Sequence, residues 1–331
     1  MSFDVFFYEA FAEEAEAIAA LVPADVQVGF TWKAVQECGP ADPQGRLVST
    51  RTQSVLPGQW AGKIDGVLTR STGYDHVLAF RRAAGQNVPA GFLPVYCARA
   101  VAEQCMLLWT ALLRKLPRQV SQLGGFARDG LTGRECLGKT VLVVGVGNIG
   151  SEVVRIAEAL GMTALGVDLV ERHDFATYTT LADGLGQADV IVCAMNLTDR
   201  NTGYFSRECL SAARRGAIFV NCARGELAPA ADLLALLDEG VLGGVGLDVY
   251  EREPSLAVAL RAGGVTADGA PPGDPAVAAT LALARRDDVI ATPHNAFNTV
   301  EALQRKAEQS VESALQFLRD GTFPNPVPEE D

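Results

Sequence analysis

Three side chains that carry reactive groups follow strand-like segments in the second half of the chain: Arg224, Glu253 and His294. An arginine at the end of a strand can bind a carboxylate and its neighbouring carbonyl through a pair of hydrogen bonds. A neutral imidazole can take a proton from an alcohol as a hydride leaves the carbon, and can return it to a ketone. A glutamate beside that imidazole can fix its tautomer and favour its charged form. Together they suit hydride-coupled proton transfer; taken singly, they also fit two surface charges and a core histidine.

The segments that must position these side chains alternate between strands and helices. Apolar strands are predicted at Val190–Ala194, Ala217–Asn221, Gly244–Asp248 and Val289–Ala291, with helices at Arg207–Arg214 and Pro229–Glu239. This alternation predicts a parallel sheet with right-handed crossovers. Because ligands of open α/β sheets bind at the carboxyl ends of the strands, the three side chains are expected at one edge of the sheet.

A glycine-rich turn precedes these strands. Residues 139–150 read Lys-Thr-Val-Leu-Val-Val-Gly-Val-Gly-Asn-Ile-Gly, and a helical pattern follows at once. In such a unit Gly145 allows the tight turn, Gly147 lets a pyrophosphate approach the backbone, and Gly150 lets helix and strand pack closely. The helix N-terminus then holds phosphates through free N–H groups and its dipole. The pattern predicts a dinucleotide-binding βαβ unit.

An acidic residue completes this unit. Its second strand, Ala164–Val167, ends on Asp168. A carboxylate there accepts hydrogen bonds from the ribose hydroxyls and repels a 2′-phosphate, so the sequence favours NAD over NADP. Arg172 lies shortly after it and would soften that preference.

The first third of the chain predicts a smaller α/β layer that lacks a glycine fingerprint of its own. A last helix at Val300–Leu318 follows the final strand, and Arg261–Thr280, rich in Gly, Ala, Pro and Thr, predicts a mobile or solvent-exposed insertion. The remaining expected elements are strands at Asp4–Tyr8, Val26–Phe30, Leu47–Thr50 and Gly66–Thr69, and helices at Glu13–Leu21 and Ala98–Leu116, the latter ending before Pro117.

Bulk properties narrow the class of protein. A chain of 331 residues exceeds the usual size of one hydrophobic core, so about two domains are expected. No apolar run is long enough to cross a bilayer, and the N-terminus lacks the basic region of a secretory signal. The net charge of −12 argues against a nucleic-acid partner and requires a local positive site for any anionic substrate. Seven cysteines without metal-ligand or redox spacing fit free thiols in a reducing cytoplasm, with no metal site.

Three motifs, in this order, resemble those of the D-isomer-specific 2-hydroxyacid dehydrogenase family. Asn-Cys-Ala-Arg-Gly resembles the family's arginine motif, Leu-Asp-Val-Tyr-Glu-Arg-Glu-Pro its glutamate motif, and Thr-Pro-His its histidine motif. The resemblance runs over nearly the whole chain. It implies that Arg224 binds the substrate, that Glu253 is the partner of the histidine, and that His294 donates the proton.

The same resemblance implies the architecture and the activity. The fold class is expected to be α/β, with two Rossmann-like domains, each a doubly wound parallel sheet, and an active-site cleft between them. The substrate domain is expected at residues 1–100 and 298–331, and the NAD-binding domain at 101–297. The expected activity is reduction of a 2-oxo acid to a D-2-hydroxy acid with NADH, in a homodimer built on helices of the nucleotide domain.

Further site residues follow from the resemblance. The family's first-domain loop is matched by Arg70 to His76, where backbone N–H groups around Thr72 and Gly73 are expected to grip the substrate carboxylate. Tyr74, Tyr96 and Arg99 complete the expected substrate contacts. The expected cofactor contacts are Gly145, Gly147, Asn148, Ile149, Gly150, Asp168, Met195, Asn196, Asn201, Cys222, Ala223 and Asp248, the last near the nicotinamide amide.

The segment Pro-His-Asn-Ala-Phe-Asn-Thr-Val-Glu-Ala-Leu looks closest to the D-lactate dehydrogenase branch, and Tyr96 also suits it. Arg99 stands where that branch usually has Asn; in a cleft it would suit a second acidic function, and in solvent it is a helix-start charge. Asn196 stands where the family usually has Pro, and the stretch 254–293 is longer than usual. Two readings stay open beside D-lactate: another acid (glyoxylate, hydroxypyruvate, a bulky or phosphorus-containing acid), or a non-catalytic NAD-sensing protein.

Overall fold

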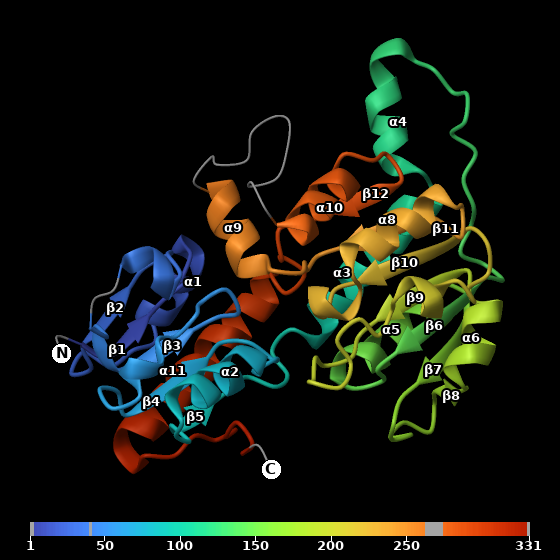
Figure 1. The fold of residues 1–331 in the computed structure, drawn as a ribbon. Coiled ribbons are helices and arrows are strands. Elements are labelled where there is room, and N and C mark those ends of the chain that lie inside the picture. The colour runs from blue at the N-terminus through green and yellow to red at the C-terminus, as the bar shows by residue number, and fades with distance from the viewer. Residues whose placement is uncertain (1–2, 40–41, 262–273, 330–331) are drawn as a thin grey trace. The chain divides into compact units, whose positions relative to one another are not determined.

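The computed structural model describes residues 3–39, 42–261 and 274–329. The chain divides into two compact units, unit 1 (Met1–Cys97 with Asn298–Asp331) and unit 2 (Ala98–Phe297) (Figure 1). Each unit contains one sheet in which every strand pair is parallel. The α/β fold class predicted from the sequence is therefore confirmed.

Unit 1 has a five-stranded sheet in the order β2-β1-β3-β4-β5. Helix α11 packs on it so closely that a Cβ on Gly66 would lie 2.5 Å from the Phe317 ring. Gly321, in the left-handed region, then ends this helix. The elements are β1 Phe3–Phe7, α1 Ala12–Ala19, β2 Val28–Phe30, η1 Val35–Cys38, β3 Gly45–Thr50, η2 Gly58–Trp60, β4 Gly66–Thr69, α2 Asp75–Ala84, β5 Ala90–Gly91 and α11 Val300–Asp320.

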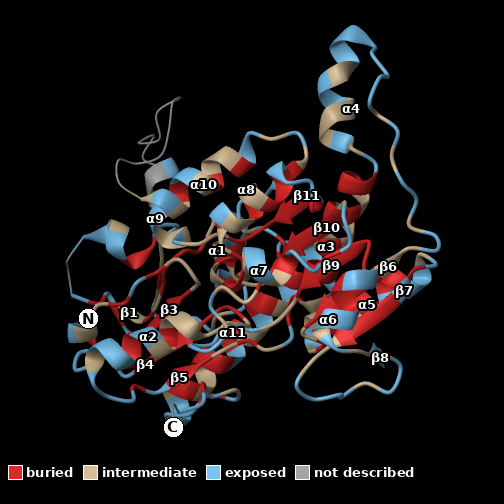
Figure 2. Ribbon diagram, turned by 45° about the vertical axis from the view of Figure 1, so that its right-hand side comes forward, coloured by how far each residue is buried: buried red, intermediate tan, exposed pale blue. Residues whose placement is uncertain are grey.

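Unit 2 has a seven-stranded sheet in the order β12-β11-β10-β9-β6-β7-β8. Its strands β9 and β10 are buried along their whole length, as Figure 2 shows in red, because helices cover both faces. The strands are β6 Thr140–Val144, β7 Thr163–Val167, β8 Thr177–Tyr178, β9 Val190–Cys193, β10 Ala217–Asn221, β11 Leu242–Leu247 and β12 Val289–Ala291. The helices are α3 Ala98–Leu113, α4 Leu116–Gln122, η3 Leu123–Gly125, α5 Asn148–Ala159, α6 Leu181–Gln187, α7 Arg207–Leu210, η4 Gly225–Leu227, α8 Ala230–Asp238, α9 Glu253–Arg261 and α10 Pro275–Ala284.

The two faces of this sheet can be told apart from neighbouring residues of β6, which point in opposite directions. A Cβ on Gly150 of α5 would meet Val143, whereas a Cβ on Gly184 of α6 would meet Leu142. Helix α3 packs against α5 on the first face, while α8 and α10 pack against each other and share the core of the second. Unit 2 is therefore doubly wound.

The predicted helix Ala98–Leu116 is wrong at its C-terminal end. Helix α3 stops at Leu113, Lys115 takes a positive φ of 53°, and α4 starts at Leu116. Proline is tolerated in the first turn of a helix because the N–H that it lacks would have no partner there. Pro117 therefore lies at the beginning of α4, which extends away from the sheet of unit 2 (Figure 1).

The predicted insertion at Arg261–Thr280 is also wrong in part. Residues 262–273 lie outside the described residues. From Pro275 the chain forms α10, whose first turn is capped by the Asp274 carboxylate, and Val277 is buried. The small apolar residues that suggest a loop in sequence are here the packing surface of a helix.

Candidate active site

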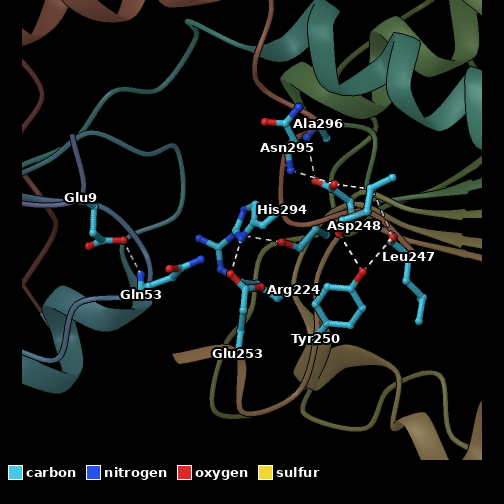
Figure 3. Close-up of polar contacts among 12 residues, drawn as sticks. Glu9, Gln53, Arg224, Leu247, Asp248, Tyr250, Glu253, His294, Asn295 and Ala296 are labelled. Carbon is cyan, nitrogen blue, oxygen red and sulfur yellow. Dashed lines mark hydrogen bonds and ion pairs between the residues drawn. The ribbon is translucent and has the colours of Figure 1, made fainter. Parts of the chain in front are cut away.

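Loops at the ends of three adjacent strands bring together the side chains predicted to do chemistry. Strands β10, β11 and β12 are neighbours in one parallel sheet, so the loops that follow them leave from the same edge. Arg224 follows β10, Glu253 follows β11 and His294 follows β12. Figure 3 shows the three side chains gathered in one place, as the sequence predicts.

His294 and Glu253 form a direct pair. The imidazole Nδ1 lies 2.5 Å from Glu253 Oε1, and the side chains are 16% and 13% exposed. An ionised carboxylate only accepts hydrogen bonds, so this contact fixes the proton on Nδ1 and leaves Nε2 to exchange a proton with a ligand. His294 has a positive φ of 51°, a conformation that non-glycine residues hold only where the surroundings enforce it.

The electrostatics of Glu253 favour its ionised form. Burial alone would raise the pKa of this carboxyl, but the charge and hydrogen bond of His294 and the charge of Arg224 outweigh it. The net result is a pKa below the usual value, so the carboxylate partner of His294 persists well into the acid range.

Arg224 is held near the pair by a close approach of two loops. A Cβ on Gly225 would come within 1.9 Å of the Tyr250 carbonyl carbon, so only glycine lets the arginine motif lie against the glutamate motif. Arg224 itself has an extended backbone, and its Nη1 donates to the Ala223 carbonyl at 2.8 Å. The guanidinium is thus one of the charges that act on Glu253.

Asp248 is fully buried and organises the loop that carries His294. Its Oδ1 accepts hydrogen bonds from the Thr292 hydroxyl (2.6 Å) and the Asn295 N–H (2.8 Å), and its Oδ2 accepts from the Ala296 N–H (2.8 Å). Burial raises the pKa of Asp248, although His294 and these hydrogen bonds oppose the rise. The resemblance places Asp248 near the nicotinamide amide, and its position beside the His294 loop is compatible with that expectation.

Tyr250 was not among the predicted site residues. Its hydroxyl donates to the Thr292 carbonyl at 2.7 Å and so ties the β11 loop to the β12 loop. Burial, with the nearby charges of Asp248 and Glu253, raises the pKa of this phenol, which therefore stays protonated as a donor. The sequence signal was its place inside the glutamate motif, but a tyrosine three residues past a strand carries no role by its type alone.

The glycine-rich turn has the geometry that its spacing predicts. Gly145 has a φ of +93°, and a Cβ there would lie 2.6 Å from the Met195 nitrogen. A Cβ on Gly150 would lie 1.9 Å from the Gly145 carbonyl oxygen, so α5 and the turn are in contact. A Cβ on Gly147 would meet nothing within 4 Å, which leaves the N-terminus of α5 open to a phosphate group. These residues therefore fit a dinucleotide.

The remaining predicted cofactor residues also lie along this edge of unit 2. Asp168 directly follows β7, and its carboxylate accepts hydrogen bonds from the Val146 (2.7 Å) and Val170 (3.3 Å) N–H groups. Asn201 closes the loop after β9 by donating to the Asn196 carbonyl (2.8 Å) and accepting from the Thr198 N–H (2.7 Å). The others are Asn148 and Ile149 at the start of α5, Met195 after β9, and Cys222 and Ala223 after β10.

In unit 1, the predicted substrate loop is braced by its own hydroxyl groups. The Thr69 hydroxyl hydrogen-bonds to Ser71 (2.7 Å) and to His76 Nε2 (2.8 Å), and the Ser71 hydroxyl donates to the Gly73 carbonyl (2.7 Å). The Thr72 hydroxyl donates to the Leu93 carbonyl at 3.2 Å. These bonds fix the backbone around Thr72 and Gly73.

Three other residues predicted to contact substrate lie in different settings. The Tyr74 ring packs edge-on against Phe92 in unit 1. Tyr96, also in unit 1, is buried, and its carbonyl accepts a hydrogen bond from Arg305 Nε at 2.9 Å. Arg99, in unit 2, is exposed and forms ion pairs with Glu103 (2.6 Å) and Glu152 (3.4 Å).

In the described parts of the chain, no group of three or more His, Cys, Asp or Glu side chains is arranged to hold a metal ion. Among the helices of residues 3–39, 42–261 and 274–329, none is long and apolar enough to span a bilayer.

Comparison with known proteins agrees with this geometry. Residues 105–296 match the NAD binding domain of the D-isomer specific 2-hydroxyacid dehydrogenases. The chain is 30% identical to 2-hydroxyacid dehydrogenase A of Aspergillus oryzae over 276 residues, which cover 82% of this chain and 77% of that protein. It is 31% identical to the D-lactate dehydrogenase kk1H of Curvularia clavata over 260 residues, covering 77% of this chain and 72% of the other.

A solved structure adds a match over the whole fold. The D-lactate dehydrogenase of Aquifex aeolicus, crystallised with NAD and lactic acid, superposes with a TM-score of 0.81 at 27% identity and covers 98% of this chain and 100% of its own. The chain thus belongs to the D-isomer specific 2-hydroxyacid dehydrogenase family. It is an NAD-dependent enzyme of this class, which reduces 2-oxo acids to 2-hydroxy acids.

Proposed function

We propose that this chain reduces a small 2-oxo acid to the D-2-hydroxy acid, with pyruvate and D-lactate as the first pair to test, and that His294 moves the proton. The observation that carries this proposal is the 2.5 Å contact between His294 Nδ1 and Glu253, with Arg224 acting on the same carboxylate. Bound NADH supplies the hydride for C2 of the acid.

His294 is proposed as the general acid in reduction and the general base in oxidation. With Nδ1 held by Glu253, the protonated ring delivers its proton from Nε2 to the carbonyl oxygen that becomes the hydroxyl. The Glu253 carboxylate stabilises the imidazolium before transfer and keeps the tautomer correct after it. Tyr250 and Asp248 act through position, because they bind the backbone and side chain around His294.

Arg224 is proposed to bind and polarise the substrate. A guanidinium can donate two parallel hydrogen bonds, one to the carboxylate and one to the adjacent carbonyl oxygen. This arrangement orients C2 and favours the negative charge that develops on oxygen. The backbone N–H groups of Thr72 and Gly73, on the braced loop of unit 1, are also proposed to bind substrate.

The cofactor is proposed to be held by the glycine-rich turn and Asp168. Open space at Gly147 admits the pyrophosphate to the N-terminus of α5, and the Asp168 carboxylate takes the ribose hydroxyls. Met195, Asn196, Asn201, Cys222 and Ala223 line the loops that would border the nicotinamide half.

We further propose that the protein is a cytoplasmic homodimer. The structure leaves large apolar side chains exposed on α4 and the segment after it: Leu116, Val120, Leu123 and Phe126. Four exposed apolar side chains within eleven residues form a patch, unlike single exposed residues scattered over a surface. Such a patch fits contact with a second copy of the chain. Light scattering should give twice the mass of the chain, and Val120→Glu with Leu123→Glu should give the single mass.

The experiment that tests the proposed activity is a panel of 2-oxo acids with NADH. Pyruvate, glyoxylate, hydroxypyruvate, a bulky 2-oxo acid and a phosphonate analogue would be compared by kcat/KM, with the product resolved by chirality. We expect turnover with at least one acid, the product to be the D enantiomer, and pyruvate to be among the best. Binding of NADH with no turnover of any acid would instead favour an NAD-sensing protein.

A further inference from the structure

Unit 1 contains a buried cluster of charges that the proposed mechanism does not use. Arg70 Nε lies 2.8 Å and Lys306 Nζ 2.9 Å from the same oxygen, Glu14 Oε1, and all three side chains are 0% exposed. Arg70 also donates to the Ser49 hydroxyl (2.9 Å) and the Tyr8 carbonyl (2.7 Å). Two cations on one carboxylate, away from water, leave an excess of positive charge that costs folding free energy.

Two more charges border this cluster. Arg51, after β3, is half-buried and lies close enough to act on both Glu14 and Lys306. The Glu9 carboxylate accepts hydrogen bonds from the backbone N–H groups of Arg51, Gln53 and Ser54. The cluster has a net charge of +1 when Lys306 is protonated and of zero when it is not. This sum counts the cations Arg51, Arg70 and Lys306 and the anions Glu9 and Glu14.

The cluster is next to the predicted substrate contacts of unit 1. Arg70 immediately precedes the Ser71–Gly73 segment of the substrate loop. Lys306 Nζ lies 5.9 Å from the ring centroid of Tyr96, and the neighbouring Cys97 Sγ lies 3.6 Å from the Thr72 hydroxyl. Tyr96 and Cys97 therefore connect the variable charge to the loop.

Lys306 is the member whose charge can change near neutral pH. Burial lowers the pKa of its ammonium to about 7, with Arg51 and Arg70 adding to the effect and Glu14 opposing it. The other titratable groups that face it are Tyr96 and Cys97, and burial raises the pKa of both, so they stay neutral. The Glu14 pKa is lowered to about 2, since Arg70 and Lys306 outweigh its burial, so it stays charged.

We propose that Lys306 is a positioning residue whose proton sets how strongly unit 1 attracts the carboxylate of the substrate. The inference rests on the proposed function, since it takes the Thr72–Gly73 loop as the carboxylate site. The proposal also agrees with the composition. Because the net charge of the protein is −12, an anionic substrate must bind where the local charge is positive. A protonated Lys306 makes that place positive, and a neutral Lys306 does not.

The test is the pH dependence of binding of oxamate, a 2-oxo acid analogue that is not reduced, to the enzyme–NADH complex. Its Kd would be followed by NADH fluorescence at about pH 6 and about pH 8.5, on either side of the Lys306 pKa. Lys306→Met removes the variable charge, and Lys306→Arg makes it permanent. Lys63→Met is the matched control, because Lys63 is an exposed lysine of the same unit, paired with Asp42.

We expect Kd to rise with pH in the wild type and in Lys63→Met. The rise should be about fivefold larger than in either Lys306 variant, which is the size expected for one buried charge that acts on a ligand from a distance. Lys306→Arg should bind tightly at both pH values and Lys306→Met weakly at both. His294 contributes equally to all four proteins, so it cancels from the comparison. A purely structural role for Lys306 would weaken binding without changing the pH ratio.

The inference would be overturned if the ratio of the Kd values at about pH 8.5 and about pH 6 were the same in wild type and Lys306→Met. It would also be overturned if the wild type did not bind oxamate at about pH 6. If a Lys306 variant does not fold, Glu14→Gln replaces it. Removing the carboxylate that supports the ammonium leaves Lys306 neutral, so a flat pH profile is expected and a wild-type profile contradicts the inference. Oxamate binding without turnover of any 2-oxo acid would overturn the proposed function alone.

Discussion

Each unit of the molecule pairs a carboxylate with a cation, in opposite surroundings. In unit 2, Glu253 and His294 form a one-to-one pair whose side chains are 13% and 16% exposed. In unit 1, Glu14 faces Arg70 and Lys306 together, and all three are 0% exposed. The first pair can reach a ligand directly, and the second can act on one only through the field of its charges.

The backbone conformation also differs between the two groups of charges. His294 has a positive φ of 51°, and Arg252, just before Glu253, has one of 55°. Arg70 and Lys306 lie on ordinary backbone, at the end of β4 and within α11. The strained backbone therefore lies at the pair proposed to transfer a proton. The buried cluster lies on relaxed backbone and is held by packing. The comparison suits the roles proposed for them: the partly exposed pair is proposed to transfer a proton, and the fully buried cluster is proposed to act through its charge alone.

The largest effect should come from removing the common partner of the buried cluster. Glu14→Leu leaves the Arg70 guanidinium buried without its carboxylate and makes Lys306 lose its proton, so it should lower the free energy of unfolding by about 3–5 kcal/mol. Chemical denaturation measures this, and Glu14→Leu with Lys306→Met should recover part of the loss. A change below about 1 kcal/mol would mean that the cluster is not a coupled unit.

The same carboxylate gives a pH dependence with a defined sign. The Glu14 pKa falls from its usual 4.5 to about 2 on folding, so its contribution to stability is complete above about 4.5 and is lost as pH falls toward about 2. Acid denaturation of the wild type should therefore be steeper in this window than that of Glu14→Gln. Parallel curves for the two proteins would contradict the assignment.

The next effect concerns the substrate cation of unit 2. Arg224→Lys keeps the charge but loses the bidentate geometry, so kcat/KM for the preferred acid should fall about a hundredfold. NADH affinity, measured by fluorescence, should change little. Arg200→Lys, in an exposed loop of the same unit, is the matched control. Wild-type kinetics for Arg224→Lys would remove the guanidinium from substrate binding.

A smaller effect should follow from weakening the exposed pair. Glu253→Gln keeps the shape and a hydrogen-bond acceptor but removes the charge that favours the imidazolium, so kcat should fall about tenfold. A kcat close to that of the wild type would show that the charge of Glu253 is not needed for the transfer.

The smallest effect concerns the cofactor. Asp168→Ala removes the carboxylate expected to bind the ribose hydroxyls and repel a 2′-phosphate. The substitution should raise the KM for NADH several-fold. It should also reduce the preference for NADH over NADPH, measured as the ratio of the kcat/KM values for the two cofactors. The variant also loses hydrogen bonds from Val146 and Val170, so its melting temperature must be compared with wild type.

Much of the fold could be predicted because the strands are short, apolar and separated by clear turn signals. The predicted strands Gly66–Thr69, Ala217–Asn221 and Val289–Ala291 have the observed bounds. The helices α2, α6, α9 and α10 and the two-residue strands β5 and β8 were not predicted. Several of these have weak periodicity or few residues, so only tertiary packing defines them.

The candidate site divides in the same way. Arg224, Glu253 and His294 could be predicted, because each follows a strand and parallel strands end at one edge. The positive φ of His294 and the tie between Tyr250 and Thr292 could not, since they depend on how two loops meet. Lys306 could not either: a lysine in a helix is normally solvated, and only the fold buries it beside Glu14.

The most direct test of the central claim is a single turnover of enzyme-bound NADH with saturating 2-oxo acid, in wild type and His294→Gln. We expect the variant to bind NADH with unchanged affinity and to oxidise it at least about a hundredfold more slowly, the range expected for loss of a positioned general acid. A rate close to wild type would mean that the imidazole does not deliver the proton and would contradict the mechanism.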